Sequence, residues 1–130
     1  MFINISNHPS EKWGKEQTEA ANEYGKIVDI TFPNVSPEAS EGEIEDMAYG
    51  LLEDIRGMEN FYKEECRMVH LVGEPTLTVT AVSLILSHYP VCTSTTKRII
   101  TENQDGTITK TFKFERFREY RVLSGDNHDY

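Results

Sequence analysis

This sequence lacks the features that assign many chains to a class at once. Its two cysteines, Cys66 and Cys92, lie in unlike contexts without the short spacing of a zinc site or a disulfide framework, and Cys92 is expected to be a small core residue. No hydrophobic run approaches the length of a membrane span, and the N-terminal segment has neither the basic start nor the apolar block of a signal peptide. We therefore expect a cytoplasmic protein without membrane association.

Motifs for phosphate binding and nucleophilic catalysis are also absent. There is no Walker loop, no Gly-x-Gly-x-x-Gly fingerprint and no serine nucleophile elbow. The histidines show no spacing typical of metal ligands, and His70, inside an apolar strand, is interpreted as a hydrogen-bonded core residue. We expect no metal ion and no other cofactor.

Positive charge is scarce and is concentrated in one segment. The net charge is -9 at pH 7, yet residues 97–121 hold seven basic and four acidic residues, whereas residues 1–96 hold six basic and sixteen acidic ones. An acidic body repels long nucleic acid, so we expect none as a partner, but a basic segment can hold a short anion locally. The alternative is that a hairpin carries Lys and Arg only to blunt an edge strand.

What the sequence does contain is a regular alternation of strand and helix patterns. Apolar runs bounded by turn residues predict strands, and apolar spacings of three and four predict helices. The second helix opens with the Ser40-x-x-Glu43 capping box and is expected to end at Gly57, while an Asp105-Gly106 turn predicts a β-hairpin. The expected strands are residues 2–6, 26–32, 67–72 and 91–95, the expected helices 10–24, 40–56 and 76–88, and the hairpin strands 97–102 and 107–114.

This order predicts an α/β protein, a three-layer Rossmann-like sandwich with a mostly parallel sheet and a C-terminal β-hairpin. We expect a single domain at residues 1–121, with 97–121 as its hairpin extension, and a disordered tail at 122–130. If the strand order begins 2-1-3-4, the chain reverses direction between the first and third strands. In open α/β sheets, ligands bind at that switch point, beyond the carboxyl ends of the strands.

Two polar loops border the predicted switch point. The first is Asn7-His8-Pro9-Ser10, after the first strand, and the second is Gly73-Glu74-Pro75-Thr76, after the third. Each leads into a predicted helix, so free backbone N–H groups and helix dipoles favour an anion such as phosphate. The candidate ligand-binding residues of these loops are Asn7, Ser10, Gly73 and Thr76, with ordinary turn and cap roles as the alternative.

Three residues are candidates for catalysis. His8 is expected to act as a general acid or base or to donate to a phosphate, with plain solvent exposure as the alternative. Glu74, a carboxylate at the end of a buried strand, must be solvated, paired or functional. Arg98 is the expected phosphate-facing cation, because a guanidinium bridges two oxygens. Hydroxyls at the same edge complete the expected ligand-binding set: Thr78, Ser94 and Thr95.

A family resemblance rests on three stretches. They are Ser-Asn-His-Pro-Ser-x-x-Trp (Ser6 to Trp13), Gly-Glu-x-Thr-Leu-Thr (Gly73 to Thr78) and the Lys97-Arg98 segment. With the α/β order, they resemble the small stand-alone CRISPR-associated Rossmann-fold (CARF) proteins, including ring nucleases. The sequence has Asn7 where an Arg is expected from that pattern.

The resemblance implies a homodimer that binds and cleaves a cyclic oligoadenylate second messenger, with cyclic tetra-adenylate suited to a two-fold dimer. It also implies a metal-independent reaction in which a ribose 2′-hydroxyl attacks the adjacent phosphate, while the protein aligns the attack and stabilises charge. Two alternatives stay open. One is a sensor or sequestering protein of the same fold that does not cleave, and the other is an unrelated small protein that binds a mononucleotide or uses its hairpin to bind a partner.

Overall fold

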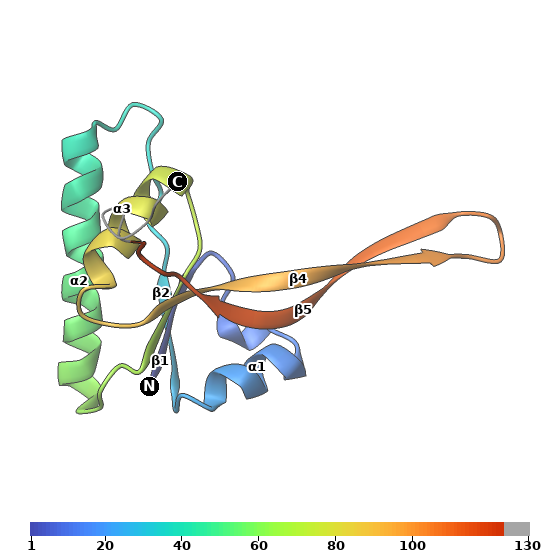
Figure 1. Ribbon diagram of the computed structural model, residues 1–130, viewed down its shortest axis with the longest axis horizontal. Coiled ribbons are helices and arrows are strands. Elements are labelled where there is room, and N and C mark those ends of the chain that lie inside the picture. Colours follow the sequence, from blue (N-terminus) through green and yellow to red (C-terminus); the bar gives the residue numbers. More distant parts are fainter. Residues whose placement is uncertain (124–130) are drawn as a thin grey trace.

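The structure, a computed structural model, describes residues 1–123 and is built of five strands and three α-helices (Figure 1). The elements are β1 (Phe2–Ser6), α1 (Lys15–Asn22), β2 (Ile27–Thr31), α2 (Glu41–Tyr62), β3 (Met68–Leu71), α3 (Pro75–Ile85), β4 (Val91–Glu102) and β5 (Ile108–Glu119), with a 3-10 turn, η1 (Ser10–Lys12), before α1. The strand order is β2-β1-β3-β4-β5, parallel except for β5. The predicted α/β class and the reversal between β1 and β3 are confirmed. The predicted tail lies outside the described residues from position 124 on.

Helices cover both faces of the sheet, which explains why its central strands are buried along their whole length. On one face, α2 and α3 pack with side chains such as Leu51, Ile55 and Leu77 in the larger core. On the other face, α1 packs over a smaller cluster that includes Phe2 and Ala21. Figure 1 shows α1 and α2 on opposite sides of the strands. The three-layer arrangement follows from these two cores.

Helix α2 begins where the sequence predicts and ends later. Ser40 caps it, because its Oγ accepts a hydrogen bond from the Glu43 backbone N–H at 3.2 Å. The prediction that Gly57 ends the helix is wrong, since the helix continues to Tyr62 and closes at Lys63 in the left-handed conformation (φ 54°). Gly57 is exposed, so it weakens the helix without breaking it.

The first helix is shorter than predicted. Residues 10–12 form one 3-10 turn, and α1 itself begins at Lys15, after Gly14 in an extended conformation. Because of this interruption, Trp13 is not part of a continuous helix, and its ring packs against the smaller cluster around Phe2. No helix within residues 1–123 is long and apolar enough to cross a membrane.

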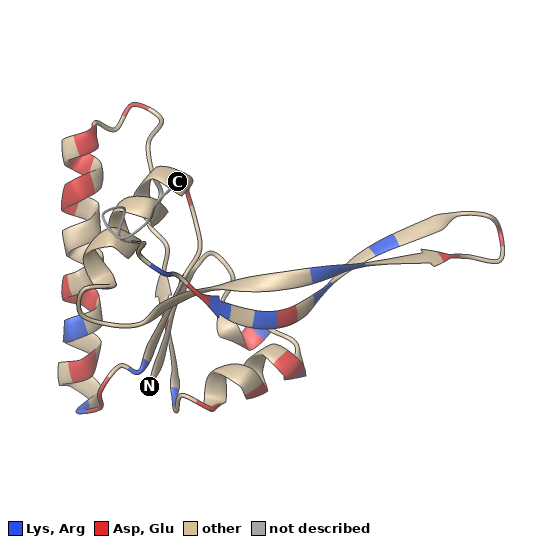
Figure 2. Cartoon of the chain, in the orientation of Figure 1, with Lys and Arg blue, Asp and Glu red and all other residues tan. Residues whose placement is uncertain are grey.

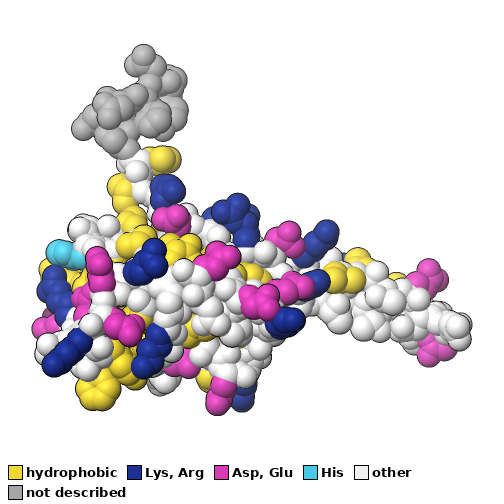
Figure 3. All heavy atoms as spheres, turned by 90° about the horizontal axis from the view of Figure 1, so that it is seen from below, with side chains coloured by type: hydrophobic (Ala, Val, Ile, Leu, Met, Phe, Trp, Pro, Cys, Tyr) yellow, Lys and Arg dark blue, Asp and Glu magenta, His cyan; other side chains and the backbone are white. Residues whose placement is uncertain are grey.

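The C-terminal hairpin is longer than predicted and forms an arm, defined here as β4, β5 and the turn between them. β4 is one continuous strand, with a bulge between Thr95 and Thr96, where the sequence predicts two strands. The Asp-Gly turn is present, with Gly106 at a φ of 85°. The arm projects from the body (Figures 1 and 3). Basic residues gather along it, whereas acidic residues gather on α1 and α2 (Figure 2).

Candidate functional site

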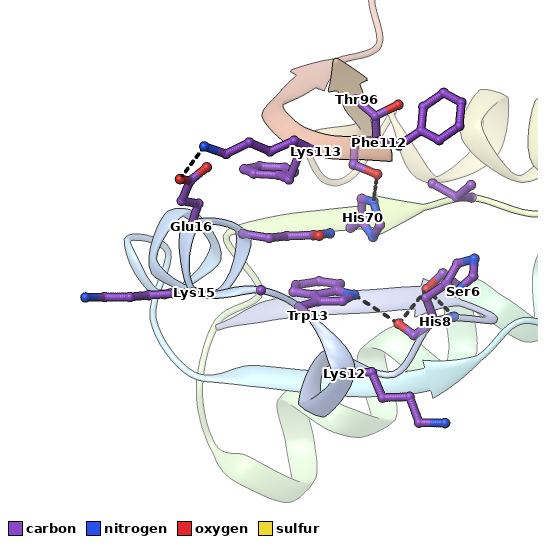
Figure 4. A pocket seen from close by; sticks show the side chains of 15 residues that line it. Ser6, His8, Lys12, Trp13, Lys15, Glu16, His70, Thr96, Phe112 and Lys113 are labelled. Atoms are coloured by element: carbon purple, nitrogen blue, oxygen red, sulfur yellow. Dashed lines mark hydrogen bonds and ion pairs between the residues drawn. The ribbon is translucent and has the colours of Figure 1, made fainter. Parts of the chain in front are cut away.

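A cleft of about 570 Å³ opens on the α1 face of the sheet, at the carboxyl ends of β1 and β3 where the strand order reverses (Figure 4). The loop after β1, the η1–α1 segment, β3, and the start of the arm all contribute to it. Segments far apart in the sequence therefore meet here. The lining side chains that could bind a ligand or take part in a reaction are His8, His70, Lys12, Lys113, Ser94 and Trp13.

The loop after β1 is held by hydrogen bonds to its backbone. The His8 carbonyl accepts from Asn4 Nδ2 at 3.0 Å and from Trp13 Nε1 at 3.2 Å. Ser10 anchors the other end, because its backbone N–H and its Oγ both donate to the Asp29 carboxylate on β2. These contacts fix the backbone and leave the His8 side chain exposed at the cleft.

A row of hydrogen-bonded side chains crosses the sheet beneath the cleft. Parallel pairing places Asn4 of β1 beside Asp29 of β2 on one side and His70 of β3 on the other. Asn4 Nδ2 donates to Asp29 Oδ1 at 2.8 Å, and Asn4 Oδ1 lies 2.8 Å from His70 Nδ1. His70 Nε2 in turn lies 3.1 Å from Ser94 Oγ on β4. Four strands thus supply one residue each to a network that ends at the cleft wall.

Burial keeps the His70 imidazole neutral. The residue is 3% exposed, and its ring lies 6.1, 5.6 and 5.3 Å from the ring centroids of Phe2, Trp13 and Phe117. Desolvation in this surrounding, with a further contribution from His8, lowers the pKa of His70 to about 4. Near neutral pH, one ring nitrogen therefore carries a free lone pair.

Ammonium groups bring positive charge to the cleft. Lys12, Lys15 and Lys113 line it, from the η1 turn, the start of α1 and the arm. Lys113 Nζ pairs with Glu16 Oε1 at 3.0 Å, which joins the arm to α1 (Figure 4). Both partners are more than half exposed, so the pair adds little stability and can exchange for an anionic ligand.

The structure brings only some of the predicted site residues to this cleft. His8 and Ser94 line it, and Ser10 anchors its loop. Asn7 is exposed in the same loop but does not line the cleft. The Thr95 hydroxyl donates to a β5 carbonyl at 3.2 Å, within the arm. Of the predicted residues, His8 in the first loop and Ser94 near the start of β4 therefore meet at one cleft.

The predicted second wall, Gly73 to Thr78, lies elsewhere. β3 leads into α3, which packs on the opposite face from α1, so this loop leaves the sheet on that face. Glu74 and Thr76 line a separate hollow of about 350 Å³, together with Pro37 and its neighbours. The expectation that they meet His8 in one crevice is not met.

Glu74 instead caps α3. Its carboxylate accepts from the backbone N–H of Thr76 at 2.8 Å and of Leu77 at 2.9 Å. These hydrogen bonds lower the pKa of Glu74. Packing explains the glycine at position 73, because a Cβ there would overlap the buried ring of Phe32. The loop that looks functional in the sequence is explained by these structural roles.

Two further predicted residues also lie apart from the cleft. Arg98 is exposed on the arm, opposite Phe112 in the strand register. Thr78 lies in α3, where its hydroxyl oxygen is buried without a hydrogen-bond partner among the described residues. The cations at the cleft are lysines and not the predicted arginine.

Sequence reasoning misses the cleft residues that come from other elements. His70 is buried and hydrogen-bonded, as the sequence indicates, yet its ring also reaches the cleft wall. Trp13, which the sequence assigns to a helix face, lines the cleft from the segment between η1 and α1. Lys12 and Trp13 directly follow the polar loop in the sequence, and this position is the signal that could have indicated them as cleft residues.

The arrangement suits a small ligand that carries phosphate and a base. Lysines attract phosphate, imidazoles transfer protons, and aromatic faces such as Trp13 and Phe112 stack on bases. Within residues 1–123, no group of three or more His, Cys, Asp or Glu side chains is placed to hold a metal ion.

Comparison with known proteins returns a family and no named activity. The model of the "Uncharacterized protein MJ1673 family" matches residues 1–118, a span that includes every cleft residue and nearly all of the arm. No curated protein and no solved structure matches the chain.

Proposed function

This chain belongs to the uncharacterized protein MJ1673 family, and from its cleft we propose that it is a ring nuclease that binds and cleaves a cyclic oligoadenylate, with cyclic tetra-adenylate as the expected ring. The ribose 2′-hydroxyl attacks the adjacent phosphate without a metal ion, and the 5′-oxygen leaves. The products are linear oligoadenylates with 2′,3′-cyclic phosphate ends. A homodimer, with two copies of the cleft, matches the two-fold symmetry of such a ring.

The observation that carries the proposal is the set of side chains that meet at the strand-order reversal. A cyclic oligoadenylate presents phosphates, ribose hydroxyls and adenines. Lys12 and Lys113 offer charge to the phosphates, Trp13 and Phe112 offer surfaces to the bases, and the site has its own imidazoles. Because the body around the cleft is acidic, a short ligand is favoured over a long RNA.

His8 is the group assigned to proton transfer at the leaving oxygen. The hydrogen bonds from Asn4 and Trp13 fix the backbone of His8, so the exposed imidazole extends from a fixed position. A positioned acid or base contributes about 10²- to 10⁴-fold to a rate. This range sets the size of effect that a substitution should show.

The test combines thermal shift with chromatography of products, using cyclic tri-, tetra- and hexa-adenylate and linear tetra-adenylate as the control ligand. We expect a saturable rise in Tm and a linear product with one of the rings. His8→Ala should lower the cleavage rate about 100-fold or more while the protein stays folded. His88→Ala, which alters an exposed histidine away from the cleft, should leave the rate unchanged.

The same experiment separates the alternatives. Saturable binding without product, unaffected by His8→Ala, indicates a sensor or sequestering protein. If no ring changes the Tm and none is cut, the proposal is contradicted, and a mononucleotide ligand or a protein partner of the arm becomes the better interpretation.

A further inference from the structure

We propose that Ser94 and His70 form the proton acceptor of the cleft: Ser94 Oγ takes the proton of the ligand's attacking hydroxyl while its own proton moves to His70 Nε2. The inference rests on the proposed function, because it assigns the base for that reaction. It is carried by the row Asp29, Asn4, His70 and Ser94, whose hydrogen bonds allow one arrangement of protons.

The direction of the hydrogen bonds follows from a backbone carbonyl. The His8 carbonyl can only accept, so the Asn4 atom 3.0 Å from it must be the amide nitrogen. The same nitrogen donates to Asp29 Oδ1 at 2.8 Å, which holds the amide in this orientation. The Asn4 atom facing His70 is then the carbonyl oxygen, and His70 Nδ1, 2.8 Å away, must carry the hydrogen.

The His70 tautomer in turn decides what Ser94 can do. With hydrogen on Nδ1 of a neutral ring, Nε2 holds a lone pair, so Ser94 Oγ at 3.1 Å must donate to it. A hydroxyl has a single hydrogen, so Ser94 can offer only lone pairs to the cleft. A ligand group beside it must be a donor, and the ribose 2′-hydroxyl is the donor that the proposed reaction has to deprotonate.

His70 can receive a proton but is closed to solvent. It is 3% exposed, and its Nε2 is hydrogen-bonded to Ser94 Oγ, so a ligand in the cleft exchanges a proton with it through Ser94. Burial lowers its pKa to about 4, which keeps Nε2 unprotonated at neutral pH. When the proton arrives, the Nδ1–H bond to Asn4, whose amide is held in place by Asp29, keeps the His70 ring oriented toward Ser94.

The step balances without a co-reactant. The 2′-hydroxyl proton passes to Ser94 as the Ser94 proton passes to His70, and the 2′-oxygen forms its bond to phosphorus. The P–O5′ bond breaks, and the 5′-oxygen takes a proton from the His8 side chain at the cleft edge. After product release, the proton leaves His70 by way of Ser94, and His8 regains one from solvent. Ring opening is thus an isomerisation.

The first test needs no ligand. Nitrogen-15 NMR of the histidine rings at pH 7 should show His70 as the Nδ1–H tautomer, with no proton on Nε2. Ser94→Ala should shift the Nε2 resonance and leave Nδ1 protonated, whereas Ser87→Ala, at an exposed serine outside the cleft, should shift neither. An Nε2–H tautomer in the wild-type protein would overturn the relay, whatever the ligand is.

The second test uses cyclic tetra-adenylate with wild-type, Ser94→Ala and Ser94→Thr proteins. We expect Ser94→Ala to lower the single-turnover rate about 100-fold, with a Kd within about threefold of wild type and a protein that is still folded at the assay temperature. Ser94→Thr keeps the hydroxyl and should recover at least about a tenth of the wild-type rate.

The outcomes distinguish the two proposals. If Ser94→Ala cuts the ring as fast as wild type, the relay is overturned and the proposed function stands. If the wild-type protein leaves the ring uncut, the proposed function fails, and the relay fails with it because it has no reaction to serve.

Discussion

The chemistry of the cleft depends on one histidine that the fold has removed from water. Both ring nitrogens of His70 are paired, with Asn4 and with Ser94, as a buried polar group requires. Neither partner is a carboxylate, so a charged ring would lose its hydration without gaining an ion pair. This is why burial is the first cause of the lowered pKa of His70. The same residue must then make folding depend on pH.

We expect the free energy of unfolding to fall as the pH drops from about 6.5 toward 4. The pKa of this histidine is about 6.5 when unfolded and about 4 when folded, so between these values the unfolded state binds more protons. His70 alone should account for about 2 kcal/mol of the loss between pH 7 and pH 4.5. Urea titrations at both pH values measure this change in the free energy of unfolding for the wild-type and His70→Gln proteins, with His88→Gln as the control. If His70→Gln shows the same pH dependence as wild type, the assignment is wrong.

Two glycines provide a second residue-scale prediction, with opposite signs. A Cβ at Gly73 would overlap the ring of Phe32, which is 3% exposed and cannot move without disturbing the core, so Gly73→Ala should lower stability by about 1–3 kcal/mol. At Gly57, no atom lies within 4 Å of the position that a Cβ would take, so Gly57→Ala should raise stability by about 0.5–1 kcal/mol. Chemical denaturation of both variants tests the pair. A neutral Gly73→Ala would show that the ring has room to shift.

At the scale of elements, local signals predict where most helices and strands begin, and packing decides where they end. The Ser40 capping box and the Asp105-Gly106 turn act over a few residues, and both are present as predicted. Gly57 carries an equally plain signal, yet α2 passes through it, because Met58 and Tyr62 still pack against the core beyond it. The end of a helix is therefore not a local property.

The candidate site is predictable where its residues are contiguous. The loop around His8 follows a strand and is polar throughout, so the sequence indicates it directly. The buried row has no such signal, since Asn4 lies 25 residues from Asp29 and 66 from His70 and meets them only through strand register. The loop that contains Glu74 is also contiguous and polar, yet it does not reach the cleft. The sequence does not indicate toward which face of the sheet this loop turns.

At the scale of the whole molecule, packing within the body does not explain how the arm is stabilised. A two-stranded ribbon in water is marginally stable by itself. This one also exposes apolar side chains, from Ile99 at 38% to Phe112 at 68%, without a layer to cover them (Figure 3). Its basic residues are opposite in charge to the acidic surface of α2 (Figure 2). A second copy of the chain offers the acidic surface of α2 and exposed apolar side chains such as Tyr49 and Phe61, and two-fold pairing would serve both arms at once.

We therefore expect a homodimer in which each arm lies on the partner's body. Replacing residues 99–111 by an Asn-Gly turn joins Arg98 to Phe112, which face each other across the ribbon, and should give a monomer. The Tm should stay near that of the wild type, because no removed residue belongs to either core. Light scattering after size-exclusion chromatography measures the mass. The removed segment holds Ile99, Ile100 and Ile108 but only one of the seven basic residues of 97–121, so this variant tests the apolar contact. Charges of opposite sign are screened over about 10 Å at 0.1 M salt, so a charge contribution should appear as a weaker wild-type dimer at higher salt. The prediction is contradicted if the wild-type protein is a monomer at every concentration or if the shortened variant remains a dimer.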